Sequence, residues 1–147
     1  MDHLRRFFRL PAGERFFLFR ALSLLAATRI ALWLLPFRVV QRISPKVDRA
    51  CSAFQKRSEF SRDRGIWAIQ VASRYVPRAS CLTQALATQA LLGFSRIPTS
   101  VRIGVAKSKA GNFEAHAWLE SDGEILMGGA DANQRYTRLL SFGSGER

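Results

Sequence analysis

The order of apolar and polar residues along the chain divides it into a helical front part and a back part that contains strands. Residues 14–35 are strongly apolar and contain no proline or glycine before Pro36, which predicts one long helix. Arg20 and Arg29 interrupt its apolar runs, so the segment falls short of the ~18 to 20 uninterrupted apolar residues expected of a membrane-spanning helix. We therefore expect a helix buried against the rest of the protein or against a partner, with peripheral membrane contact as the alternative.

Two more helices are predicted in the middle of the chain. Ser61 stands where it can cap a helix that ends near Pro77. Ser80 can cap a second helix in the same way, and Cys81 is the first residue of that helix. Gly93 is expected to be the residue just after its C-terminal end. The dipole and the unpaired N–H groups at a helix start favour the thiolate form of a cysteine.

We expect a boundary near residue 60. Residues 38–60 are mixed and basic, and Ser44-Pro45 predicts a break between helices. This divides the chain into a helical N-terminal region, residues 1–60, and a core, residues 61–147. Cys51 has no histidine near it in the sequence and is expected to be an inert thiol.

After Gly93 the period of the pattern changes from that of helices to that of strands. Residues 100–106 and 113–120 are expected to form strands, and Asp122-Gly123 is expected to form a tight turn into residues 124–127. Alternation along the second strand puts four residues on one face, namely Glu114, His116, Trp118 and Glu120. We expect the helix that begins at Cys81 to cover this face.

Composition and charge narrow the class of protein. The chain has 147 residues and 48% apolar content, which suffices for one domain with a buried core. Its net charge of +12 is uneven, because residues 1–79 carry +11 and residues 80–147 carry +1. A basic half suits nucleic acid, an anionic membrane surface or an acidic partner. We expect no nucleic-acid binding, because zinc-finger spacing and aromatic-and-basic strand motifs are both missing.

The two cysteines and two histidines suggest nucleophilic chemistry. Cys81 precedes His116 by 35 residues, an order that places a helix-start thiol beside an imidazole on a strand and suits acyl transfer or peptide-bond hydrolysis. Two cysteines are too few for a disulfide framework, so we expect the reducing cytoplasm. The spacings match no compact zinc site, the chemistry requires no cofactor, and the question of a nucleotide stays open.

A third group is expected to orient the imidazole. Glu120 lies four residues further along the same strand, about 13 Å away at ~3.3 Å per residue, and cannot reach the ring. With a two-residue turn, His116 is expected to face Gly129 across the hairpin, and Asp131 becomes its diagonal neighbour on the same face. We predict Asp131 as the orienting acid, with Asn133 as the substitute, because an amide can also orient a histidine.

Three motifs stand out around the candidate residues, namely PRASCL at residues 77–82, RIGV at residues 102–105 and AHAWLESDG at residues 115–123. Together they resemble the leader peptidases of lasso-peptide biosynthesis, which are members of the transglutaminase-like, papain-related cysteine protease superfamily. Residues 6–15 and 34–38 resemble the helical front of the stand-alone form. The resemblance implies an α+β fold, in which N-terminal helices precede a papain/transglutaminase-like core whose Cys helix packs on a small antiparallel sheet.

The resemblance also implies a reaction and partners. Such a peptidase removes the leader from a ribosomally made precursor and acts with a separate leader-recognition protein. An asparagine-synthetase-like cyclase then uses the freed amine. The family's acid falls about a dozen residues beyond the histidine, where this chain has Gly128 and Gly129. Two alternatives remain, a transglutaminase-like acyltransferase and a non-catalytic peptide-binding module of the same fold.

Overall fold

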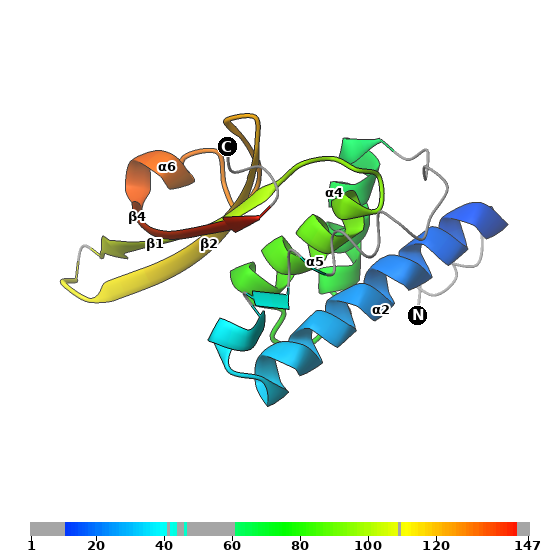
Figure 1. Cartoon of the computed structure of the whole chain (residues 1–147), viewed down its shortest axis with the longest axis horizontal. Coiled ribbons are helices and arrows are strands. Elements are labelled where there is room, and N and C mark those ends of the chain that lie inside the picture. The colour runs from blue at the N-terminus through cyan, green and yellow to red at the C-terminus, as the bar shows by residue number, and fades with distance from the viewer. Residues whose placement is uncertain (1–10, 41, 44–45, 47–60, 109, 144–147) are drawn as a thin grey trace.

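The structure is a computed structural model, and it describes residues 11–40, 42–43, 46, 61–108 and 110–143. Within these residues lie the helices α2 (Ala12–Leu34), α4 (Arg62–Ser73) and α5 (Cys81–Gly93). The strands β1 (Ser100–Lys107), β2 (Phe113–Ser121) and β3 (Glu124–Met127) follow, and then α6 (Ala132–Arg135) and β4 (Thr137–Gly143). Helices α2, α4 and α5 lie on one side of the sheet, and α6 lies on the other (Figure 1).

The helix ends follow from local side-chain chemistry. Ser61 accepts a hydrogen bond from the backbone N–H of Arg64 at 3.3 Å, which confirms it as the cap of α4. Ser80 does the same for the N–H of Thr83 at 3.3 Å and caps α5. The predicted position of Gly93 was wrong by one residue, because Gly93 is the last residue of α5 and not the residue just after its end.

The sheet has the strand order β3-β2-β1-β4, and its neighbouring strands are antiparallel. The three expected strands form within one residue of their predicted bounds. Asp122 and Gly123 make the turn with φ of 49° and 81°, a backbone conformation that suits a tight hairpin. The sequence pattern missed α6 and β4, because α6 has only four residues, too few to show a helical period, and the first four residues of β4 are all exposed.

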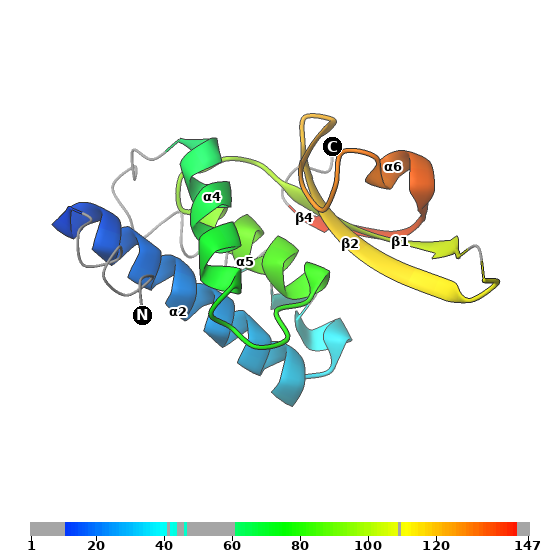
Figure 2. The same ribbon diagram turned by 180° about the vertical axis from the view of Figure 1, so that it is seen from behind.

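One hydrophobic core joins the helices to the sheet. Helix α2 contributes Leu18, Ala21 and Leu25, and it packs on both α4 and α5. Strand β1 contributes Val101 and β2 contributes Leu119, so the inner face of the sheet closes the same core. Figure 2 shows α5 between α2 and the sheet from behind. The predicted boundary near residue 60 lies outside the described residues and stays a prediction.

Helix α5 covers the face of β2 opposite to the one we expected. Leu119 shares the core with α5, and the hydroxyl of Thr88 on α5 lies 3.3 Å from the sulfur of Met127, the partner of Leu119 in β3. Trp118 is fully buried on the other face, where the ring of Tyr136 lies 6.4 Å from it. The leucine fits the apolar surface of α5, whereas the indole N–H needs the polar partner that the other face provides.

Candidate active site

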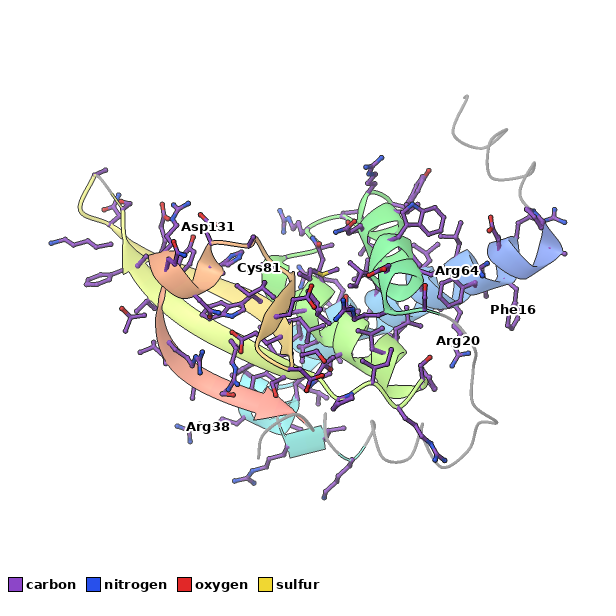
Figure 3. All side chains as sticks on the ribbon, turned by 90° about the horizontal axis from the view of Figure 1, so that it is seen from above. Phe16, Arg20, Arg38, Arg64, Cys81 and Asp131 are labelled. Carbon is purple, nitrogen blue, oxygen red and sulfur yellow. The ribbon has the colours of Figure 1, made fainter. Side chains whose placement is uncertain are left out.

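Cys81 begins α5, as the sequence predicts, and its thiol is half-buried and reduced (Figure 3). The segment before it is held in place, because the side-chain amide of Gln84 donates to the carbonyl of Ala79 at 3.0 Å. Ser80 Oγ also lies 3.0 Å from Thr83 Oγ1. The backbone N–H of a first helical residue has no partner within the helix, so it is available to an oxyanion.

His116 lies in the middle of β2 opposite Gly104 of β1. Its Nε2 atom is 2.6 Å from the carbonyl oxygen of Gly128. A carbonyl only accepts hydrogen bonds, so Nε2 donates in this contact, and in the neutral ring Nδ1 is then the nitrogen with the lone pair. The geometry therefore makes Nδ1 of the neutral ring the atom that can act as a base, and the Gly128 carbonyl is a hydrogen-bond partner that holds the ring at Nε2.

Tyr136, which sequence reasoning missed, holds the imidazole from one side. The two rings stack with centroids 5.0 Å apart and an interplanar angle of 26°. Gly104 contributes space, because a Cβ there would lie 2.8 Å from the carbonyl of Thr137 and 2.9 Å from the Trp118 ring. Tyr136 is preceded by a polar stretch without a strand pattern, so only the packing identifies it.

A β-bulge explains why a carbonyl stands beside His116. The expected register holds for the pairs Glu120↔Ile125 and Ser121↔Glu124, but it shifts by one residue at Leu119↔Met127, where the ladder ends. The predicted pairing of His116 with Gly129 is therefore not made. Gly128 turns the chain with a φ of 109°, and a Cβ on it would lie 2.5 Å from that of Trp118.

Asp131 lies just beyond this turn. It is the N-cap residue of α6, its side chain is exposed, and it makes no capping hydrogen bond (Figure 3). Asn133, the substitute, hydrogen-bonds to Glu120. The role of Asp131 as the orienting acid stays a prediction, and the described contact of the ring is with Gly128.

The position of Cys81 relative to His116 is set by the packing of α5 on β2. Among the described residues, no hydrogen bond joins the thiol to the ring. By alternation His116 shares the Trp118 face, whereas α5 packs on the Leu119 face. β3 pairs with β2 only from Leu119 to Ser121, so a thiol–imidazole contact has to form around the edge that β3 leaves uncovered. The catalytic pairing stays a prediction.

Glu120 is the centre of a buried polar cluster on the same face. Its carboxylate accepts from Trp118 Nε1 at 2.8 Å and from Arg102 Nε at 2.9 Å, and Arg138 Nη2 lies 3.7 Å away. Burial by itself raises the pKa of Glu120. The hydrogen bonds from Trp118 and Arg102 and the charge of Arg102 outweigh burial, so the pKa lies below its ordinary value. This cluster fixes the indole next to the His116 ring.

We expect acid to weaken the fold through Glu120. Because the folded state lowers the pKa of this carboxyl, its contribution to stability is complete above the ordinary glutamate pKa and is lost as the pH falls through the lowered value. The difference in free energy of unfolding between the wild type and Glu120→Gln should therefore shrink from pH 7 to about pH 3. Urea unfolding at each pH measures it, and a difference independent of pH would contradict the expectation.

The fold and the site together define the class of the protein. An α+β chain, in which a cysteine begins a helix that packs on an antiparallel sheet with a histidine on its second strand, belongs to the cysteine peptidase and acyltransferase class. The transglutaminase-like superfamily matches residues 24–141, and the chain belongs to this superfamily. Its members are in general cysteine proteases or transferases. No curated protein and no solved structure matches the chain.

This match confirms the predicted α+β fold, with N-terminal helices followed by a transglutaminase-like core. It does not extend to the narrower leader-peptidase group. Among the described residues, no group of three or more His, Cys, Asp or Glu side chains could hold a metal ion. The candidate residues for the chemistry stay the Cys81 thiol and the His116 ring, which Gly128 and Tyr136 contact.

Proposed function

We propose that this protein is a cysteine peptidase that removes the leader from a ribosomally made lasso-peptide precursor. It acts together with a separate leader-recognition protein, and the freed amine passes to an asparagine-synthetase-like cyclase. The observation that carries the proposal is the capped start of α5 at Cys81, on a helix that packs on β2, the strand that carries His116. The motifs around both residues resemble those of leader peptidases, and the chain is a member of the transglutaminase-like superfamily.

The proposed reaction uses the sulfur and the backbone N–H of Cys81 and the Nδ1 atom of His116. Nδ1 of His116 takes the proton of the Cys81 thiol, and the sulfur bonds to the carbonyl carbon at the leader–core junction. The backbone N–H of Cys81 stabilises the oxyanion that forms. When the C–N bond breaks, His116 returns the proton to the amine of the core peptide, which leaves. Water then hydrolyses the thioester, so that the leader departs with a new carboxylate.

A reconstituted reaction tests the proposal. The full chain is incubated with a precursor peptide and the recognition protein, and the products are identified by mass spectrometry. We expect two peptides, leader and core, whose summed mass exceeds that of the precursor by one water. A product cross-linked with loss of ammonia would instead identify an acyltransferase, and an unchanged precursor would contradict the proposed peptidase.

A peptide-binding module is the second candidate, and one observation favours it. The thiol and the ring are not hydrogen-bonded in the described structure, as a resting catalytic pair often is. Alkylation separates the two candidates, because an activated Cys81 should react faster than Cys51 at neutral pH. Equal rates for the two thiols, measured in variants that retain one cysteine each, would favour the binding module.

A further inference from the structure

Helix α2 carries an apolar stripe on its outer face. Five large side chains on it are strongly exposed, with exposed fractions of 71% for Phe16, 62% for Phe19, 55% for Ile30, 77% for Trp33 and 65% for Leu34. Their spacing places them on one side of the helix, opposite the side that is buried in the core. The stripe spans about 25 Å at 1.5 Å per residue. Exposed apolar surface of this extent marks an interaction site.

Helix α2 and the segment that follows it are rich in positive charge. Six cations and one acid occur among the described residues between 12 and 46, the cations being Arg15, Arg20, Arg29, Arg38, Arg42 and Lys46. The acid, Glu14, is paired with Arg64 at 3.4 Å. In the segment after the helix, the apolar Val39 and Ile43 and the basic Arg38 and Arg42 are exposed as well. Figure 3 shows Phe16 and Arg38 projecting away from the body of the protein.

We propose that the outer face of α2 docks this protein on the surface of an anionic lipid membrane, with the helix lying in the plane of the interface. Phenylalanine and tryptophan side chains insert at the level of the headgroups, and the arginines bind the lipid phosphates. We infer an anionic membrane as the binding partner from charge complementarity, because acidic lipid headgroups attract a surface whose net charge is strongly positive. The proposal does not depend on the chemistry at Cys81.

The inner face of α2 argues for docking and against spanning. The helix is long and apolar enough to cross a membrane by length and composition, with a mean hydropathy of 1.6 in its most apolar window. Leu18, Ala21 and Leu25, however, pack in the same core as α4 and α5, and a spanning helix would have to leave that core. Because α2 and the sheet lie on opposite sides of α5, docking through α2 leaves the sheet on the side of the protein away from the membrane (Figure 1).

Vesicle flotation with the full chain tests the proposal. We expect binding to vesicles of phosphatidylglycerol and phosphatidylcholine, and weak binding to pure phosphatidylcholine. The triple variant Phe16→Ser, Phe19→Ser, Trp33→Ser should bind about ten-fold more weakly or worse, because it removes the inserted side chains. These residues are exposed, so the fold should persist, and circular dichroism checks it. Arg38→Gln and Arg42→Gln should each weaken binding about five-fold at low salt.

The matched control is Phe113→Ser with Leu139→Ser. Both side chains are large and exposed, at 80% and 60%, but they lie on strands of the sheet, so vesicle binding should not change. Failure to bind anionic vesicles at low salt would overturn the proposal, and so would wild-type binding by the triple variant. A dimer that dissociates in the triple variant without any vesicle binding would assign the stripe to a second copy. Resistance to both high salt and alkaline extraction would indicate a spanning helix.

Discussion

Replacing Cys81 by alanine is expected to abolish leader removal in the reconstituted reaction, with a loss of about 10⁴-fold or more. The sulfur is the only atom in the proposed mechanism that bonds to the substrate carbonyl, so no neighbouring group can replace it. The side chain is small and half-buried, and the stability should therefore change by no more than about 1 kcal/mol. Mass spectrometry of the products and a urea unfolding curve measure the two effects separately.

The control for this variant is Cys51→Ala. Cys51 lies outside the described residues, and its sequence context predicts an inert thiol, so activity should be retained. A Cys81→Ala variant with full activity would end the peptidase proposal. Loss of activity in both variants together with a lowered unfolding midpoint would mean that the fold, and not the nucleophile, had been removed.

Replacing Glu120 by glutamine is expected to lower the free energy of unfolding by about 3 kcal/mol at neutral pH. Glu120 is 6% exposed and its carboxylate is the shared acceptor of Trp118 and Arg102, so the change removes the negative charge that pairs with the partly buried guanidinium of Arg102. Thermal and urea unfolding measure the loss. Because the indole lies beside the His116 site, the variant should also lose order around Tyr136, which near-ultraviolet circular dichroism detects.

Glu124→Gln is the matched control for Glu120→Gln. Glu124 also forms an ion pair, at 2.8 Å with Arg62, but its side chain is 62% exposed. Solvent and salt screen such a surface pair, so its loss should cost about 0.5 kcal/mol or less. Equal effects of the two substitutions would show that burial around Glu120 does not carry the stability that we assign to it.

Much of the candidate site could be predicted because its signals are local. Ser80 and Cys81 form a helix start through one side-chain-to-backbone bond, and this needs no information from the rest of the chain. The turn at Asp122-Gly123 is equally local, since it depends on two residues that accept a positive φ. These features, with the alternation along β2, were sufficient to predict where the two candidate residues lie in the elements.

The contact of His116 with the Gly128 carbonyl could not be predicted in the same way. The pairing of facing residues holds next to the turn and then fails at one bulge, which no residue pattern in β2 or β3 signals. The consecutive glycines at 128 and 129 were the available signal, because both adopt a positive φ. If Gly128 and Gly129 are interpreted as a turn, and not as a place where an acid is missing, they suggest a backbone hydrogen-bond partner for the His116 ring.

The sequence by itself determined the three helices α2, α4 and α5, the strands β1 to β3, the two serine caps and the position of Cys81 at a helix start, because these depend on residues within one or two turns of each other. Only the tertiary structure decided which face of β2 meets α5, and that Gly128 and Tyr136 hold His116. Those outcomes depend on contacts between distant segments, such as Gly104 with Trp118 and Arg102 with Glu120. Two faces of one strand can each suit burial, and only the competition among all the packed elements assigns them.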